Sequence, residues 1–391
     1  MVQLLELLLD NNYKVTFATP AASTSFMADL DSIGIRSENI AVNDPRFDKF
    51  ILELQPSIVV FDRFMMEEQF GWRVAKQCPD AVRILDTEDL HFLRKNRESQ
   101  FSGKQKTKHS ALASREIASI YRCDQSLIIS EVEMKLLTTQ YKVPRELLFY
   151  LPFLHEEIIQ SENDLPTFEA RKNFIFIGNM RHAPNIDAVI FLKEKIWPLI
   201  FKELPDTEMH IYGAYASSKI DRLHDPKLGF HIKGRAENAG VVVKNSRVSL
   251  VPLRFGAGLK GKLTEAMICG TPSVTTSIGA EGINGSLPWS GTITNDPEEF
   301  AAAAITLHEN KEIWKIAKNN GFEIINSRFS KRSFAPLFIA RLIEITQGLT
   351  THRDNNFTGT MLMHHRVQST YFLSKYIESK TELERLRQSI K

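Results

Sequence analysis

Residues 251–283 read VPLRFGAGLKGKLTEAMICGTPSVTTSIGAEGI. The apolar run that ends at Leu253 predicts a strand, and the glycine-rich residues after it predict a loop. A helix is expected from Leu263 to Cys269, because Gly270 suits a left-handed helix end and Pro272 cannot extend the helix. Residues 273–277 predict the next strand. This stretch therefore indicates an α/β fold in which a glycine loop joins a strand to a helix.

The loop has the chemistry of an anion site. Its glycines let the backbone approach a ligand closely, and the N–H groups at the start of the following helix carry partial positive charge; these glycines are Gly256, Gly258 and Gly261. Lys260 and Lys262 add charge, and Glu265 can accept hydrogen bonds from the vicinal hydroxyls of a sugar. Phosphate beside ribose indicates a nucleotide. The alternative is a tight turn with solvated lysines, and the spacing fits neither the P-loop nor the Rossmann glycine pattern.

The run G-A-G-x-K-G-K-x-x-E-A-M-x-x-G-x-P-x-V-x-T-x-x-G-A-E-G, from Gly256 to Gly282, resembles the nucleotide-sugar site of the group 1 (family 4) retaining glycosyltransferases of GT-B fold. The resemblance implies an α/β chain with two Rossmann-like domains that face a central cleft. It also implies that Glu265 holds the donor ribose and that Lys262 faces the diphosphate. The chain departs from many members at Ala257, where they carry a glutamate that contacts the donor sugar.

Composition and charge limit the other function classes. The chain has 391 residues and a formal net charge of +2, which gives no overall attraction to nucleic acid or membranes. Its three cysteines lack metal-ligand spacing and predict reduced, packed thiols. The N-terminal apolar run contains Glu6 and has no basic segment before it, so it does not predict a signal peptide. We expect a cytoplasmic protein without a transmembrane segment and without nucleic-acid partners.

The first half, residues 1–154, alternates predicted strands and helices, which is typical of a parallel sheet covered on both faces. Its early elements include a helix over residues 24–33 and a short strand at residues 40–42. The alternation starts at a helix, residues 2–9, whereas a Rossmann-like domain starts at a strand with a glycine loop. We therefore expect the first strand of this N-terminal, acceptor-side domain to be missing. Either the sequence is a fragment or a truncated isoform, or the acceptor site is altered.

A cluster of polar residues follows the predicted strand that ends at Asp86. Glu88 and His91 are the candidates for catalysis here, because the ends of parallel strands present side chains to a cleft. In the family that the chain resembles, a histidine near this position touches the donor sugar, and the sequence does not decide between the two residues. The alternative is structural: Asp86 or Asp89 caps a helix and His91 packs against it.

The second half begins after a polar segment, residues 155–172, that has the composition of a linker between domains. Residues 173–347 predict the Rossmann-like domain that binds the nucleotide sugar. By resemblance, Gly178 and Arg181 form a second diphosphate contact, with the arginine binding oxygens in a bidentate manner, and the backbone near Gly234 reads the base. Arg181 could equally be a surface residue.

Residues 348–391 predict a polar linker followed by a long helix. The helix, residues 361–391, either packs back across the first domain or binds a protein partner.

The resemblance implies that the chain moves a sugar from a nucleotide-diphosphate sugar, its co-substrate, to an acceptor with retention of configuration. The acceptor could be a glycan, a lipid or a protein. Arg181 and Lys262 would neutralise the departing diphosphate, and neither a metal site nor a cofactor is expected. Two alternatives remain. One is an epimerase or hydrolase of nucleotide sugars with the same architecture. The other is a degenerate, non-catalytic relative that acts as a binding partner or scaffold.

Overall fold

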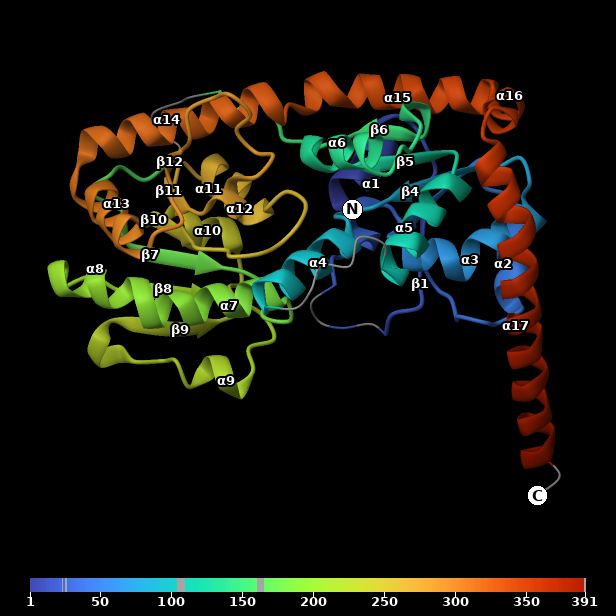
Figure 1. Cartoon of the computed structure of the whole chain (residues 1–391), viewed down its shortest axis with the longest axis horizontal. Coiled ribbons are helices and arrows are strands. Elements are labelled where there is room, and N and C mark those ends of the chain that lie inside the picture. The colour runs from blue at the N-terminus through green and yellow to red at the C-terminus, as the bar shows by residue number, and fades with distance from the viewer. Residues whose placement is uncertain (23, 25–26, 104–109, 160–164, 390–391) are drawn as a thin grey trace. The chain divides into compact units, whose positions relative to one another are not determined.

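The computed structural model describes residues 1–391 except 23, 25–26, 104–109, 160–164 and 390–391, and except the side chains of residues 365–369. The chain forms two compact units. Unit 1 contains residues 1–88, 109–151 and 335–391, and unit 2 contains residues 89–108 and 152–334. Each unit has parallel strands with helices packed around them (Figure 1). The expected α/β class is therefore confirmed in both units.

Unit 2 is built on a six-stranded parallel sheet in the order β12-β11-β10-β7-β8-β9. The chain adds strands on one side of β7 and then crosses to the other side, so the order reverses between β7 and β10. The strands are β7 (Lys172–Ile177), β8 (Met209–Tyr212), β9 (Phe230–Gly234), β10 (Ser246–Val251), β11 (Ser273–Thr275) and β12 (Gly291–Ile293). In such sheets, ligands bind where the order reverses, at the carboxyl ends of the strands.

Helices cover the sheet of unit 2, and side chains of both the strands and the helices form its core. Apolar side chains of β7 and β10, among them Phe174, Phe176 and Val248, pack with Trp197 in one buried cluster. A π-helical segment, residues 192–196, joins two of the helices. The helices are α4 (His91–Phe101), α7 (Ala183–Phe191), α8 (Trp197–Glu203), α9 (Ser218–Asp221), α10 (Ala239–Lys244), α11 (Gly261–Ile268), α12 (Ser277–Ala280), α13 (Pro297–Glu309) and α14 (Lys311–Arg328).

Unit 1 contains two separate parallel sheets. A two-stranded sheet pairs β1 (Thr16–Thr19) with β2 (Arg36–Asn39). The other sheet has the order β3-β4-β5-β6, with β3 (Ile58–Asp62), β4 (Val82–Asp86), β5 (Gln125–Ile128) and β6 (Leu148–Tyr150). No strand among the described residues joins β1 to β3, so the two sheets are separate.

The helices of unit 1 come from both ends of the sequence. They are α1 (Val2–Asp10), α2 (Arg46–Leu54), α3 (Phe64–Gln77), α5 (Ala111–Arg122), α6 (Glu131–Thr139), α16 (Leu349–Asp354) and α17 (Phe357–Ser389). Helix α15 (Lys331–Gln347) runs from unit 2 into unit 1.

Helices α16 and α17 are held to the first half of the chain by aromatic and ionic contacts. The rings of Tyr371 and Trp72 pack edge to face at a centroid distance of 5.7 Å. Arg353 forms two hydrogen bonds of 2.8 Å with the carboxylate of Asp124. Residues 348–360, expected as a linker, thus form α16 and the start of α17. No described helix has the length and apolarity that crossing a membrane requires.

Two early predictions were wrong. The helix expected over residues 24–33 is only a turn of 3-10 helix at Asp31–Ile33, and the strand expected at residues 40–42 is β2, which ends at Asn39. Polar side chains that bond to nearby backbone favour turns over helix here. The hydroxyl of Ser32 donates to the carbonyl of Asp29, and the carboxylate of Asp29 accepts from the N–H of Ser32. Part of this segment, and part of the expected linker 155–172, lies outside the described residues.

Candidate functional site

The glycine loop lies at the carboxyl end of β10, beside β7, where the strand order reverses. Gly258 adopts φ +62°, a conformation that favours glycine. Lys260 is buried, and its ammonium donates a 2.8 Å hydrogen bond to the carbonyl of Gly258. Gly261 is the first residue of α11. The loop therefore presents glycine backbone at the helix start, while the charge of Lys260 is directed at the loop itself.

Lys262 reaches from α11 to β7. Its Nζ lies 2.5 Å from Oδ1 of Asn185 and 4.3 Å from the ring centre of Phe176. A Cβ added to Gly178 would lie 2.7 Å from this Nζ. Burial of the ammonium end lowers the pKa of Lys262 to about 7. The structure thus brings together Gly178 and Lys262, which the sequence predicted for the same diphosphate.

Glu265 follows Lys262 on α11 by almost one turn and is half-buried. Burial raises the pKa of its carboxyl group. A carboxylate that has lost part of its water gains from new hydrogen-bond donors, because burying a charge without partners is unfavourable. Sugar hydroxyls can supply such donors.

The carboxyl ends of β7, β8 and β9 bring three glycines side by side. The N–H of Gly178 donates to the carbonyl of Tyr212 at 3.0 Å, and the N–H of Gly213 donates to the carbonyl of Gly234 at 2.8 Å. Gly234 adopts φ +71°. A Cβ on Gly213 would lie only 2.3 Å from the carbonyl oxygen of Gly178. This edge of the sheet therefore has bare backbone, which allows the close approach that a diphosphate needs.

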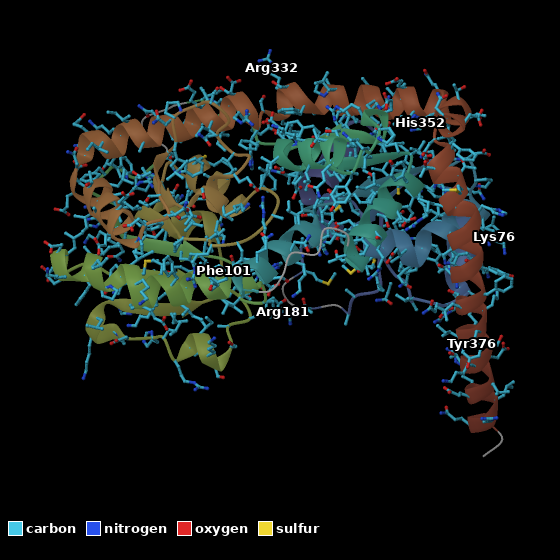
Figure 2. The ribbon with its side chains drawn as sticks, viewed as in Figure 1. Lys76, Phe101, Arg181, Arg332, His352 and Tyr376 are labelled. Carbon is cyan, nitrogen blue, oxygen red and sulfur yellow. The ribbon has the colours of Figure 1, made fainter. Side chains whose placement is uncertain are left out.

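Arg181 lies in the turn ahead of α7 and is exposed (Figure 2). Its guanidinium stacks over the ring of Tyr215, with the Cζ atom 3.6 Å from the ring centre. Its backbone N–H donates to Oδ1 of Asn179 at 2.9 Å. The arginine is therefore oriented by an aromatic ring beside the glycines of β7 and β8.

Helix α4, which comes from the first half of the sequence, packs beside the glycine loop. Arg97 donates to both carboxylate oxygens of Glu281, at 2.7 and 2.8 Å, and to the carbonyl of Gly256 at 2.8 Å. Phe101, at the end of α4, stacks on Phe255 at a centroid distance of 5.3 Å. These contacts anchor the start of the loop, where Gly256 lies.

Glu88 and His91 belong to different units. Glu88, the last residue of the first segment of unit 1, has φ +59°, and its N–H donates to Oδ1 of Asp86 at 3.3 Å. Burial, and then the charge of Glu88, raise the pKa of Asp86 to about 6. His91 opens α4 in unit 2, with Nε2 3.6 Å from Oδ1 of Asp89. The role of either residue at the donor sugar stays a prediction.

Sequence reasoning missed the contacts of Asn185, Tyr215 and Arg97. Asn185 had a usable signal, because it is a polar residue in the first turn of the helix after β7, the place where α/β sheets bind ligands. Tyr215 and Arg97 had none, since their partners lie 34 and 184 positions away in the sequence. No group of His, Cys, Asp and Glu among the described residues has the arrangement of a metal site.

Comparison with known proteins agrees with this geometry. Residues 171–310 match the model of the family described as glycosyl transferases group 1. An uncharacterized 44.6 kDa protein in the cps region of Klebsiella pneumoniae is 27% identical over 174 residues, which is 42% of this chain and 45% of the relative.

Solved structures share the fold at low sequence identity. Sucrose-phosphate synthase from Thermosynechococcus elongatus matches with a TM-score of 0.65 at 15% identity, over 88% of this chain and 91% of that protein. HepE of Anabaena, in complex with UDP and glucose, has a TM-score of 0.61 at 12% identity, over 89% and 95%. A mutant of TarM from S. aureus, in complex with fondaparinux, alpha-GlcNAc-glycerol and UDP, has a TM-score of 0.60 at 14% identity, over 75% and 58%.

The match to the Klebsiella relative thus spans about half of that protein, and the match to TarM spans 58% of it. Residues 171–310 thus match the group 1 glycosyltransferase family, and the chain has the GT-B fold.

Proposed function

We propose that this protein transfers a sugar from a nucleotide-diphosphate sugar to an acceptor, with retention of anomeric configuration and without a metal ion. The observation that carries the proposal is the enclosed ammonium of Lys262 beside Gly178, at the point where the strand order of unit 2 reverses. Its hydrogen-bond partner is the neutral amide of Asn185, and no carboxylate among the described residues forms an ion pair with it, so a diphosphate would meet an uncancelled positive charge.

Each group at the site has its own role in the proposed reaction. Backbone N–H groups at the start of α11 and the bare backbone at Gly178 receive the diphosphate oxygens. Lys262 neutralises charge that develops on the diphosphate as the bond to the sugar breaks, and Arg181 adds a second cation at the rim. Glu265 accepts hydrogen bonds from the ribose hydroxyls. Rate enhancement then comes from positioning and from electrostatic stabilisation of the leaving group.

The similar solved structures indicate which nucleotide donors to test first. TarM and HepE were solved with UDP, so UDP-sugars are the first donors to test and GDP-sugars the second. The same proposal includes a contact between the donor sugar and either Glu88 or His91. The three cysteines are free and buried, as in proteins of reducing compartments, and we propose the cytoplasm as the site of action.

Binding of radiolabelled UDP-glucose and GDP-glucose to the wild type and to Lys262→Met tests the proposal. Methionine keeps the length and the apolar stem of lysine but removes the charge. We expect at least about tenfold weaker donor binding, since a charge-assisted hydrogen bond contributes about 1.5–3 kcal/mol. Equal binding by both folded proteins would remove the assigned phosphate site.

Product analysis tests the reaction itself. With an acceptor mixture and labelled donor, a transferase gives label in a larger product whose anomeric configuration, read by NMR, matches that of the donor. Free sugar formed at the same rate without any acceptor would indicate a hydrolase, and an isomerised nucleotide sugar would indicate an epimerase. Tight donor binding without turnover under all conditions would favour the non-catalytic alternative.

A further inference from the structure

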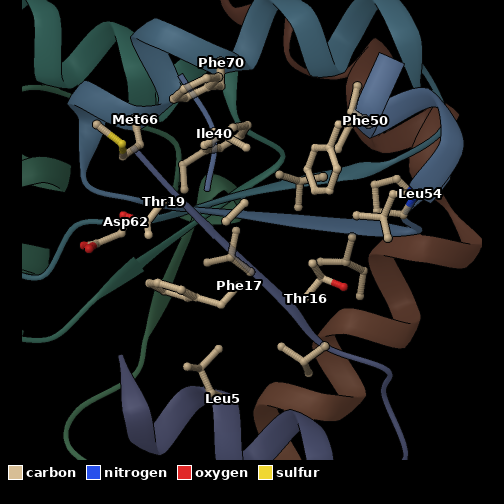
Figure 3. Close-up of a pocket in the computed structure, with 18 of the residues that line it drawn as sticks. Leu5, Thr16, Phe17, Thr19, Ile40, Phe50, Leu54, Asp62, Met66 and Phe70 are labelled. Atoms are coloured by element: carbon tan, nitrogen blue, oxygen red, sulfur yellow. The ribbon is translucent and has the colours of Figure 1, made fainter. Parts of the chain in front are cut away.

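Unit 1 contains a cavity of about 270 Å³ between its two sheets. Figure 3 shows its apolar lining, with Phe17 of β1, Leu5 of α1, Phe50 and Leu54 of α2, and Phe70 of α3. Every residue of β1 and every residue of β3 contributes to the wall. The cavity therefore lies between two parallel sheets and is also lined by residues of helices α1, α2 and α3.

Both strands at the cavity have one edge without a partner among the described residues. The carbonyl of Thr19 accepts a hydrogen bond from the N–H of Ile40, so the backbone N–H and C=O groups of Thr19 point toward β2. Because backbone groups alternate along a parallel strand, those of Ala18 point to the opposite edge. No described strand other than β2 pairs with β1.

The same alternation applies to β3. The carbonyl of Ser57 accepts from Val82 at 2.9 Å, and the N–H of Arg63 donates to Asp86 at 2.7 Å, so the odd-numbered residues face β4. The N–H and C=O groups of Ile58 and Val60 therefore point to the other edge. Within the described part of the chain, β4 is the one strand that pairs with β3.

Burial of the strands shows the same gap. Strand β5 is buried throughout and β4 nearly so, as expected for a parallel sheet covered on both faces. Strand β3 has the apolar sequence IVVFD, yet only Phe61 is fully buried, and all four residues of β1 are half-buried. Strand β3 thus has the composition of an interior strand, but the surroundings of both strands leave them partly open.

We propose that the cavity binds one extended, apolar peptide strand, which pairs in parallel with β1 and β3 and joins the two sheets into one. A peptide fits better than an acyl chain, because the open edges offer hydrogen-bond donors and acceptors that a hydrocarbon leaves unsatisfied. The occupant would carry β-branched residues, whose side chains alternate toward the two faces of the sheet. This inference concerns unit 1 and does not depend on the proposed sugar transfer.

The test adds a synthetic peptide to the intact protein. The peptide has five alternating valine and isoleucine residues, matched to the five residues of β3, and a Gly-Lys tail for solubility. Hydrogen exchange is followed residue by residue. We expect exchange at the amides of Ala18, Ile58 and Val60 to slow at least about tenfold on saturation. The amides of Phe17 and Val59, which already face neighbouring strands, serve as internal controls and change little.

A second peptide with the same sequence and backbone N-methylation at alternate residues is the matched control. It keeps the side chains but removes hydrogen-bond donors, so we expect binding at least about tenfold weaker. Decanoate is the comparison for a lipid occupant. Equal binding by both peptides, no saturable binding of the first peptide, or equal protection of Ala18 and Val60 by decanoate would each overturn the proposal.

Discussion

The ammonium of Lys262 lies 2.5 Å from the amide oxygen of Asn185, so an enclosed cation has a neutral hydrogen-bond partner. Burial alone accounts for the fall of its pKa to about 7. An ammonium of this kind is easily deprotonated in the free protein and regains its proton when an anion binds beside it. Charge at the candidate diphosphate site is therefore linked to pH in the neutral range.

We expect the affinity of the wild type for UDP-glucose to fall as pH rises above about 7, by at most about tenfold per pH unit, because the free lysine must then take up a proton on binding. Below pH 7 the affinity should be flat. Isothermal titration between about pH 6 and 8.5 measures this. Lys262→Arg keeps its charge throughout and should show no slope; a flat profile in the wild type would contradict the linkage.

Replacing Glu265 with glutamine should weaken binding of a uridine nucleotide by about tenfold, because a charged acceptor for the ribose hydroxyls becomes neutral. The same substitution should leave binding of the 2′,3′-dideoxy nucleotide unchanged, since that ligand lacks both hydroxyls. Fluorescence competition gives the four dissociation constants of the cycle. An identical loss for both ligands would place Glu265 away from the ribose.

Gly178→Ala should reduce donor affinity, because the new Cβ would lie 2.7 Å from Nζ of Lys262 and 2.9 Å from the side chain of Asn185. Both neighbours are side-chain ends that can move, so the free energy of unfolding should change by less than about 1 kcal/mol. The matched control is Gly240→Ala, whose nearest neighbour lies 3.4 Å away. Urea unfolding together with donor titration separates the two effects, and unchanged affinity would argue against a ligand at Gly178.

Asp124→Asn should destabilise unit 1 by about 3 kcal/mol, because it breaks a buried pair with Arg353. Burial opposes ionisation of Asp124, but the hydrogen bonds from Arg353 and the charge of Arg83 hold its pKa below the ordinary value. A carboxyl group with a lowered pKa stabilises the fold above the unfolded value near 3.8, and this stability is lost as pH falls below it.

Thermal unfolding of the wild type and of Asp124→Asn at pH 7 and at pH 3 measures that contribution. The difference between the two proteins should be large at pH 7 and smaller at pH 3. The exposed neighbour Asp354, changed to asparagine, provides the control and should have little effect at either pH. A wild-type advantage that persists undiminished at pH 3 would show that the charge of Asp124 is not its source.

The sequence was informative where a local pattern determines the structure. Gly258 needs a left-handed backbone and Pro272 ends a helix, so the strand, loop and helix around Lys262 could be predicted from neighbouring residues alone. The contacts of Lys262 with Asn185 and of Arg97 with Glu281 join residues 77 and 184 positions apart. No local pattern predicts such pairs. The direction of Lys260 was also beyond prediction, because a lysine in a glycine loop can reach outward or bond to the loop itself.

Unit 1 is assembled from residues 1–88, 109–151 and 335–391, with the whole of the remaining unit encoded between them. During synthesis on a ribosome, Asp124 and Trp72 emerge long before Arg353 and Tyr371, with which they pack. The packing of unit 1 is therefore completed only when these ionic and aromatic partners have been synthesised. Unit 2 can complete its own sheet before that. A chain that terminates before Arg353 and Tyr371 would therefore lack packing partners for the half of the protein that is synthesised first.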